Sequence, residues 1–354
     1  PTRDLTVAGI TGTNGKTSVA LLLQAILRAA GHEAANFGTI AYDLGRAQRP
    51  APLTTPFGED LAELFRAARD GGATHVSMEV SSHALDQERV AGVRFAAGAF
   101  TNLTQDHLDY HGTMENYRAA KLRLFGLLDA ETGLAVVNVD DPHAQHFLDA
   151  APRHRLTFGA QGDVRAADVH PTFRETRFTL QSPWGEAGLY FRLLGRHNVS
   201  NALCAAALAG GLGVPFDAIL RGLHEFQAVP GRFEAVARQQ PFQVIVDYAH
   251  TDDALRNVHA AAREVADHRI ITVFGCGGDR DRGKRPLMAR AVAEGADYAI
   301  LTSDNPRTES PQQILDDTEA GLEEAGWQRG REYQVIEDRR AAIYEAVLRA
   351  NNGD

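Results

Sequence analysis

Gly9-Ile10-Thr11-Gly12-Thr13-Asn14-Gly15-Lys16-Thr17-Ser18 is the stretch that decides the fold, because a hydrophobic strand-like run leads into it and an Ala/Leu-rich helical run follows it. Glycines here let the backbone wrap closely around phosphate with its amides pointing inward. Lys16 supplies a cation for the β- and γ-phosphate oxygens, and Thr17 supplies a hydroxyl for Mg²⁺. The residues predicted to hold the phosphates of ATP are Gly12, Thr13, Asn14, Gly15, Lys16, Thr17 and Ser18.

This loop is shorter than the usual phosphate-binding loop, since Ile10 stands where the first glycine of that loop is expected. A glycine turn before a helix, with an exposed lysine, is the competing structural interpretation. Strand, loop, Gly-Lys-Thr and helix occur together, however, and this context favours nucleotide binding.

Around the loop, short strand-like runs alternate with helical runs. The strand candidates are Val7–Ile10, His75–Val80, Ala97–Phe100, Ala135–Val139, Gln243–Val246, Ile270–Phe274 and Tyr298–Thr302. The helix candidates are Thr17–Ala30, Gly58–Asp70, Met114–Leu127, Asn198–Leu212, Asp253–Val265, Arg285–Ala293 and Pro311–Ala325. Such alternation predicts an α/β fold with a mostly parallel sheet covered by helices. The polar stretch Arg155–Leu194 does not alternate, and we predict an antiparallel insertion there.

The length of 354 residues favours two domains over one core. Val229-Pro230-Gly231-Arg232 is predicted to be the boundary because Pro and Gly punctuate it. Residues 1–229 are then a central ATP-binding domain, and residues 230–354 form a smaller Rossmann-like α/β domain. The chain begins with Pro1 and runs almost at once into a strand-like segment, so we expect a piece of a longer protein.

Composition narrows the classes of partner. The net charge is −10 at pH 7, whereas binding to nucleic acid or anionic membrane needs clustered cations. The two cysteines, Cys204 and Cys276, are too far apart in sequence for a Cys-x-x-Cys site and fit a reducing compartment. No apolar run approaches the roughly 18 residues of a membrane helix. We expect a cytoplasmic monomer that binds neither nucleic acid nor membrane.

Polar clusters follow two further strand candidates. In Met78-Glu79-Val80-Ser81-Ser82-His83, Glu79 is a hard oxygen ligand suited to Mg²⁺, while either serine could instead cap a helix. The cluster around His107 carries acids and imidazoles in a row, which suggests metal or phosphate chemistry. Lys121 lies on the next helix candidate and, taken alone, is predicted to be a solvated lysine.

The second half carries three more candidates. Asp247 ends a strand candidate, where a carboxylate can accept hydrogen bonds from a ribose. The glycine-rich turn Phe274–Arg285 has four cations and suits anionic groups, since arginine forks match carboxylates bidentately. The segment Ser303–Arg307 contains an Asn-Pro turn signal followed by Arg307.

Taken together, eight segments in order resemble the Mur ligases over nearly the whole chain. They are GITGTNGKTS, MEVSSHAL, FTNLTQDHLDYHGTMENYRAAK, GRHNVSNALCAAALA, VPGRFE, VDYAHTDDAL, FGCGGDRDRGKRP and TSDNPRTESP. The resemblance implies a ligase that uses ATP to activate a carboxylate of UDP-N-acetylmuramoyl-L-alanyl-D-glutamate as an acyl-phosphate. It further implies that meso-diaminopimelate is then added during peptidoglycan precursor synthesis, because the Asp304-Asn305-Pro306-Arg307 segment accompanies that amino acid in the family.

The resemblance also assigns roles to residues. Lys16, Lys121 and His107 are implied in catalysis, and Lys121 is implied to be carbamylated, which makes it a carboxylate-like ligand. Metal ligation is implied for Thr17, Glu79, His107 and Lys121. Adenine and ribose-phosphate contacts are implied for Asn198, Asn201, Arg232 and Asp247. The muropeptide is implied to contact Thr54, Thr55, Ser82 and Arg89, and diaminopimelate to contact Arg280, Asp304, Asn305 and Arg307.

Three departures from the family pattern are visible. The small N-terminal domain that holds the uridine diphosphate and the C-terminal Gly-Lys-Gly-His-Glu segment are missing. Asp252 replaces a usual proline, which we expect to alter a turn.

Other classes stay open at this point. They are a lysine-adding, cyanophycin or folylpolyglutamate type of ligase, a motor or regulatory NTPase, and a non-catalytic nucleotide-binding subunit. The last should have lost Lys16, Glu79 or Lys121, and all three are present.

Overall fold

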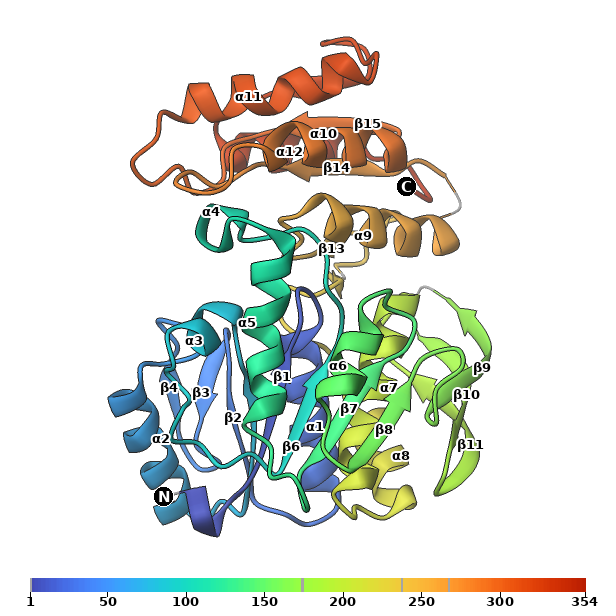
Figure 1. Ribbon diagram of the computed structural model, residues 1–354. Coiled ribbons are helices and arrows are strands. Elements are labelled where there is room, and N and C mark those ends of the chain that lie inside the picture. Colours follow the sequence, from blue (N-terminus) through green and yellow to red (C-terminus); the bar gives the residue numbers. More distant parts are fainter. Residues whose placement is uncertain (1, 173–174, 237, 267) are drawn as a thin grey trace. The chain divides into compact units, whose positions relative to one another are not determined.

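The computed structural model describes residues 2–172, 175–236, 238–266 and 268–354, which fall into two compact units. The first unit takes the chain up to Thr104 and again from Thr113 to Pro230. The second unit takes Gln105–Gly112 and Gly231–Asp354. Each unit is built from helices packed on a sheet (Figure 1), so the predicted α/β fold is confirmed. Among the described residues, no helix has the length and apolar character needed to cross a membrane.

The first unit contains an eight-stranded sheet in the order β4-β3-β2-β5-β1-β6-β7-β8. Neighbouring strands from β2 to β8 run parallel, while β3 and β4 are added antiparallel at one edge. The strand bounds are β1 Thr6–Thr11, β2 Ala34–Phe37, β3 Ala41–Asp43, β4 Gln48–Pro50, β5 His75–Glu79, β6 Ala97–Phe100, β7 Leu134–Asn138 and β8 His154–Phe158.

Both faces of this sheet are buried, because alternate residues of the central strands enter two separate cores. Along β1, Ala8 and Ile10 pack with one core and Val7 with the other. The first core is covered by α1 (Lys16–Ala29), α7 (Arg196–Gly211) and α8 (Phe216–Glu225), and the second by α2 (Gly58–Asp70), α5 (Met114–Gly126) and α6 (Ala144–Ala150). Burial on both faces explains why these strands read as nearly continuous apolar runs.

The antiparallel insertion is present, but it begins later than predicted. It consists of β9 (Arg165–Pro171), β10 (Thr176–Ser182) and β11 (Gly185–Phe191). The residues from Arg155 to Phe158, predicted to belong to it, instead lie in β8, which pairs parallel with β7. The error has a physical cause: β8 is an edge strand in which only Phe158 is fully buried, so its sequence reads as polar. Residues 173 and 174 of the predicted insertion lie outside the described residues.

The second unit has a parallel sheet of β14 (Ile271–Phe274), β15 (Tyr298–Leu301) and β16 (Tyr333–Val335). A short antiparallel pair joins β12 (Glu234–Ala235) to β13 (Ile245–Val246). The remaining helices are α3 (Ser82–Asp86) in the first unit, and α4 (Leu108–His111), α9 (Asp252–Val265), α10 (Lys284–Gly295), α11 (Pro311–Glu324) and α12 (Arg339–Arg349) in the second.

Asp252 does not alter a turn, contrary to the expectation from its replacement of proline. It is the first residue of α9, directly after the N-cap Thr251, whose side chain accepts a hydrogen bond from Ala254 N. Proline is well tolerated at the first helical position, and an acidic residue there is favoured by the helix dipole. Asp252 also forms an i,i+4 ion pair with Arg256.

Gly222 in α8 offers a test of the packing between α8 and α1. A Cβ atom at Gly222 would lie 2.5 Å from Ile26 Cα and 2.8 Å from Ile26 N. Backbone cannot move aside as a side chain can, so Gly222→Ala is expected to destabilise the first unit by about 1–3 kcal/mol. Urea unfolding followed by tryptophan fluorescence measures this, since one of the two tryptophans, Trp184, lies in the first unit.

The matched control for this prediction is Gly126→Ala at the end of α5. A Cβ atom there would meet nothing within 4 Å, so stability should stay unchanged or rise by about 0.5–1 kcal/mol. Both variants are compared in a Trp327→Phe background, because Trp327 lies in the second unit. Equal stability of the two variants would contradict the predicted close packing at Gly222.

Candidate functional site

The loop between β1 and α1 requires its glycines. Gly12 has φ +150° and Gly15 has φ +88°, conformations that L side chains rarely adopt. A Cβ atom on Gly12 would lie 1.9 Å from Thr101 Oγ1, and one on Gly15 would lie 2.4 Å from Asn201 Oδ1. Gly15 is the N-cap of α1 and has no side chain to cap it, and the first turn has no acidic residue. The positive end of α1 is therefore open to an anion.

The segment that follows β6 holds this loop in place. Thr13 N donates to Asn102 O at 2.9 Å, and Asn14 N donates to Asn102 Oδ1 at 2.8 Å. In the other direction, Thr101 Oγ1 donates to Asn14 O at 2.6 Å. These contacts fix the loop before any ligand binds, which lowers the entropy lost when phosphate is bound.

Two lysines converge on one carbonyl of the loop. Lys16 Nζ donates to Gly12 O at 2.9 Å and to Thr13 O at 2.8 Å. Lys121 Nζ, from α5, donates to the same Gly12 O at 2.8 Å and lies 4.3 Å from the centre of the Tyr117 ring. The Lys121 residue is 1% exposed, so the interpretation of Lys121 as a solvated helix lysine is wrong. Two ammonium groups beside an open helix N-terminus form a strongly electropositive cradle.

Glu79, the last residue of β5, accepts hydrogen bonds beside the loop. Thr17 Oγ1 donates to Glu79 Oε2 at 2.9 Å, and Thr39 N donates to Oε1 at 2.7 Å. A Cβ atom on Gly38 would lie 2.3 Å from Oε1, so only glycine permits this approach. A hydroxyl against a buried carboxylate fits Mg²⁺, which prefers oxygen ligands and usually adds phosphate and water. Within the described ranges, no group of three or more His, Cys, Asp or Glu could hold a metal by itself.

Three of the four predicted muropeptide residues connect to Glu79. Thr55 and Arg89 lead to its backbone carbonyl, and Thr54 leads through Thr39 to its carboxylate. Thr55 Oγ1 donates to Glu79 O at 2.9 Å, and Arg89 Nη1 donates to Thr55 O at 3.0 Å. Thr54 Oγ1 lies 3.0 Å from Thr39 Oγ1. The fourth, Ser82, is buried as the first residue of α3, next to the N-cap Ser81. The capping interpretation therefore holds for Ser81, whose hydroxyl accepts from Ala84 N at 3.2 Å.

The two asparagines predicted to contact adenine lie at the start of α7. Asn201 Nδ2 donates to Asn198 Oδ1 at 3.1 Å, and Asn198 Nδ2 donates to Leu194 O at 2.8 Å. Both residues are buried, and Asn201 Oδ1 occupies the space where Gly15 lacks a side chain. This pair therefore links α7 to the loop between β1 and α1.

His107 belongs to the second unit, whereas Glu79 and Lys121 belong to the first. Its Nε2 lies 3.3 Å from Asp106 Oδ2, with Lys284 Nζ 3.6 Å from Asp106 Oδ1 and His250 Nε2 3.8 Å from Oδ2. Burial raises the pKa of the Asp106 carboxyl, but His107, Lys284 and His250 outweigh it and lower the pKa overall. Burial also lowers the pKa of His250. His250 and Lys284 were not predicted as site residues, although each lies in a segment with functional signals.

Of the predicted ribose-phosphate residues, Arg232 lies just before β12 and Asp247 lies between β13 and α9. Asp247 Oδ2 accepts from Phe233 N at 2.7 Å, and Oδ1 accepts from Ala249 N at 2.7 Å. Burial raises the pKa of Asp247 in spite of these bonds and of nearby Arg232. The Arg232 guanidinium stacks 4.5 Å from the centre of the Tyr248 ring. Each Asp247 oxygen thus accepts one hydrogen bond from a backbone N–H group, and each can accept one further hydrogen bond.

The glycine turn after β14 and the segment after β15 lie side by side, because these parallel strands end at the same sheet edge. Gly278 N donates to Asn305 O at 2.8 Å, and Arg307 Nη1 donates to Gly278 O. Arg280 is exposed at the tip of the turn. Asp304 is half exposed and lies 3.9 Å from Arg339 Nη1. The structure therefore brings together the four residues predicted to contact diaminopimelate on one pair of loops.

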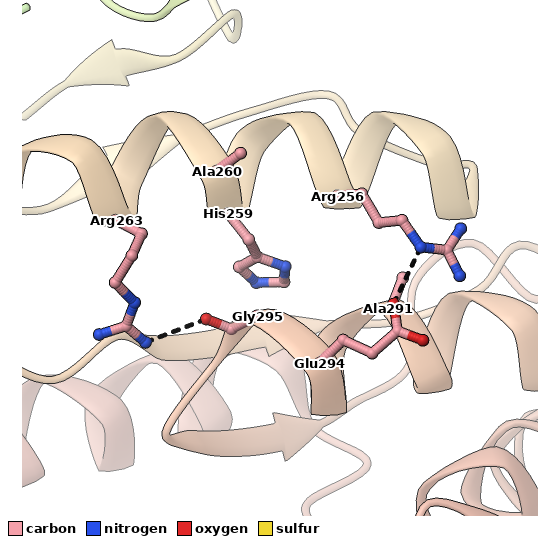
Figure 2. Close-up of a pocket in the computed structure, with 7 residues that line it drawn as sticks. All are labelled: Arg256, His259, Ala260, Arg263, Ala291, Glu294 and Gly295. Atoms are coloured by element: carbon pink, nitrogen blue, oxygen red, sulfur yellow. Dashed lines mark hydrogen bonds and ion pairs between the residues drawn. The ribbon is translucent and has the colours of Figure 1, made fainter.

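A surface groove of about 280 Å³ lies elsewhere in the second unit, between α9 and α10 (Figure 2), and none of the predicted site residues lines it. Arg256 pairs with Glu294 at 2.9 Å, and Arg263 pairs with Asp297 at 2.7 Å. Since its cations are matched by carboxylates, the groove offers no strong attraction to an anion. Its buried His259 donates to or accepts from Thr272 Oγ1 at 2.8 Å.

His259 predicts a pH dependence of stability. Burial, aided by the charge of Arg263, lowers the pKa of His259 to about 4, against about 6.5 when unfolded. The neutral ring therefore contributes stability above about pH 6.5, and this contribution falls as the pH approaches 4. His259→Gln is expected to reduce the loss of unfolding free energy over that window by up to about 3 kcal/mol. Urea unfolding at several pH values, followed by Trp327 fluorescence in a Trp184→Phe background, measures it, and an unchanged slope would contradict it.

The chain is similar to known proteins along its length. Residues 10–209 match the Mur ligase middle domain, and residues 231–354 match the Mur ligase, glutamate ligase domain. A relative from Solibacter usitatus (strain Ellin6076), named UDP-N-acetylmuramoyl-L-alanyl-D-glutamate–2,6-diaminopimelate ligase, is 47% identical over 358 residues. That alignment covers 100% of this chain and 72% of the relative.

Two solved structures are also similar. A UDP-N-acetylmuramoyl-L-alanyl-D-glutamate–2,6-diaminopimelate ligase superposes with a TM-score of 0.68 at 36% identity, covering 99% of this chain and 72% of the other. A folylpolyglutamate synthase from Mycobacterium tuberculosis, complexed with ADP, superposes with a TM-score of 0.76 at 19% identity, covering 98% and 84%. The second likeness is one of fold alone.

Proposed function

The chain belongs to the Mur ligase family, and on that premise we propose that it adds meso-diaminopimelate to UDP-N-acetylmuramoyl-L-alanyl-D-glutamate in peptidoglycan precursor synthesis, forming ADP. The observation that carries the proposal is the 47% identity, over the whole chain, to a relative named for that reaction. The intact Asp304-Asn305-Pro306-Arg307 segment supports the choice of amino acid. The folylpolyglutamate alternative rests on a structural likeness at only 19% identity.

The first chemical step is phosphoryl transfer. A carboxylate oxygen of the muropeptide attacks the γ-phosphorus of ATP, the bond to the ADP oxygen breaks, and an acyl-phosphate forms. Lys16 would leave the Gly12 and Thr13 carbonyls and turn its ammonium group toward the γ-phosphate, where charge develops. Thr17 and Glu79 would hold Mg²⁺, which neutralises phosphate charge when bound.

The second step is acyl transfer. The free amino group of diaminopimelate attacks the acyl carbon, inorganic phosphate leaves, and the amine loses a proton. Thr55 and Arg89 would hold the muropeptide beside the phosphate loop, which supplies proximity to the reacting carboxylate. The proximity of Arg89 to Thr55 and of Thr55 to Glu79 supports this role.

Selection of the amino acid is proposed for the second unit. Diaminopimelate carries a carboxylate that lysine lacks, and an arginine pairs with a carboxylate through two parallel hydrogen bonds. Arg307 and Arg280 would each contact one carboxylate. Lysine would leave one of these guanidinium groups without its partner, which disfavours it.

Four further roles complete the proposal. We propose that Lys121 is carbamylated and that His107 is a metal ligand. Asn198 and Asn201 would contact the adenine, and Arg232 and Asp247 the phosphates and ribose. The protein would act as a cytoplasmic monomer with its domain boundary near Pro230.

Phosphate release in the presence of ATP, Mg²⁺ and the muramoyl dipeptide tests the proposed function. The protein is assayed together with any sequence that flanks it in its gene, with meso-diaminopimelate and L-lysine compared at equal concentration. A kcat/KM for diaminopimelate at least about 10³-fold above that for lysine is expected, because lysine leaves a guanidinium group of the site without its carboxylate. A preference for lysine would overturn the choice of amino acid.

A further inference from the structure

We propose that Glu309 is a positioning residue that fixes the two loops carrying Arg280 and Arg307, so that the pair of guanidinium groups fits one dicarboxylic amino acid. Glu309 follows the Asp304–Arg307 segment and precedes α11. The inference rests on the proposed function, because it concerns how the amino-acid site is held in shape.

Glu309 contacts the opposite loop directly. Its Oε1 accepts from Asp279 N at 2.6 Å, and Asp279 is the neighbour of Arg280. The same Oε1 accepts from Arg285 Nη2 at 2.7 Å, and Oε2 lies 2.8 Å from Arg282 Nη2. One carboxylate on the second loop thus contacts three residues of the glycine turn and the start of α10.

A second set of contacts closes the loops from the other side. Asp279 Oδ1 accepts from Thr308 Oγ1 at 2.7 Å, and Asp279 Oδ2 accepts from Thr308 N at 3.1 Å. A Cβ atom on Gly278 would lie 1.9 Å from Pro306 O, so the two backbones are in close contact. Glu309 and Asp279 therefore hold each other's loop through reciprocal carboxylate bonds.

Arg285 ties this arrangement to the core of the second unit. Its side chain is 1% exposed and pairs with Glu309 on one side and with Asp317 of α11 at 2.8 Å on the other. A buried guanidinium needs both carboxylates, because removal of a partner leaves an uncompensated charge. Asp317 also supports Arg285, but its second oxygen accepts from Gln313 Nε2 of α11 at 2.8 Å and not from the glycine turn.

The consequence for recognition follows from geometry. Arg280 is exposed and Arg307 holds a left-handed backbone with φ +50°. If the loops moved independently, each arginine could still attract a carboxylate, but the spacing between the two would vary. Displacements of about 1 Å can reduce rates about 10²-fold. Glu309 therefore determines how strongly the site prefers an amino acid with two carboxylates over one with a single carboxylate. It does so without contacting the amino acid.

The test compares Glu309→Ala and Glu309→Gln with the control Asp317→Asn. Glu309→Ala is expected to raise the KM for diaminopimelate by about 10- to 100-fold and to reduce its preference over lysine. Glu309→Gln keeps an acceptor for Asp279 N, so its effect should be smaller. The KM values for ATP and muramoyl dipeptide should stay within about twofold. Asp317→Asn should lower the melting temperature without changing the KM for diaminopimelate.

A loss of melting temperature in Glu309→Ala with an unchanged KM would overturn the inference. If that variant does not fold, Thr308→Val removes one bond to Asp279 and should still raise the KM by a few fold. The wild-type protein tests the proposed function separately. If the wild-type protein prefers lysine, the proposed function is wrong. The KM values of the Glu309 and Asp317 variants for lysine then decide whether Glu309 positions the amino-acid loops.

Discussion

Lys16→Met is expected to lower kcat by about 10³-fold or more, because it removes the cation that would meet developing negative charge on the γ-phosphate. In the structure the Lys16 ammonium group donates to Gly12 O and Thr13 O, so it already lies at the loop that would hold the phosphates. The effect should fall mainly on kcat, since an interaction made chiefly in the transition state has little influence on KM. Phosphate release under saturating substrates measures it.

Arg28→Met is the matched control for Lys16→Met. Arg28 lies at the other end of α1 and pairs with Asp43 at the surface, so its removal changes the net charge equally and should leave kcat within about twofold. Circular dichroism checks that both variants fold. A Lys16→Met protein with more than about a tenth of the wild-type kcat would contradict the proposed phosphate contact.

Lys121→Met is expected to lower activity by about 10²- to 10³-fold, the scale of one lost electrostatic contact in a catalytic site. The proposed carbamate forms when the neutral amine adds to carbon dioxide and releases a proton. The product is an anion with one remaining N–H, which can still donate to Gly12 O, now 2.8 Å from Nζ. Because Lys121 is buried beside the phosphate loop, its carbamate would be a carboxylate-like ligand available to the proposed Mg²⁺.

Lys121→Glu separates a carbamate from an ammonium group. If a carbamate acts, glutamate should retain at least about tenfold more activity than methionine, because it supplies a carboxylate on the same face of α5, although on a shorter side chain. Depleting bicarbonate should lower wild-type activity but not that of Lys121→Glu. If an ammonium group acts, both variants should be equally inactive and bicarbonate should have no effect, which would contradict the carbamate.

Much of the fold could be predicted from the sequence, because the local conformational preferences of its segments agree with their places in the fold. The buried parallel strands produce apolar runs, and the phosphate loop needs glycine at positions where a Cβ atom would clash. Features that depend on distant neighbours were not accessible. β2 has the sequence Ala-Ala-Asn-Phe, without β-branched residues, and was not among the candidates; it is a strand because β5 and β3 pair with it. The polar sequence of β8 concealed its place in the main sheet.

The candidate site was accessible to a similar degree. Motif chemistry predicted the phosphate loop and Glu79, and the fold brings Glu79 into contact with Thr17, 62 positions away in the sequence. Burial of Lys121 could not be predicted from a helical pattern, because it depends on the Gly12 carbonyl and on the Tyr117 ring, over which the ammonium group lies. Glu309 gave no signal either, since an acid after a turn is ordinarily solvated and only the folded loops bring it to Asp279 and Arg285.

The division of the chain into units has a practical meaning for dissecting the protein. Gln105–Gly112 leaves the first unit, joins the second and returns, so the polypeptide passes between the units three times. A gene fragment that starts at Gly231 would omit Asp106, and with it the carboxylate that faces Lys284 and His250. Separating the chain at Pro230 would therefore give a second unit that lacks Gln105–Gly112. That segment would have to be supplied by mixing in the other fragment.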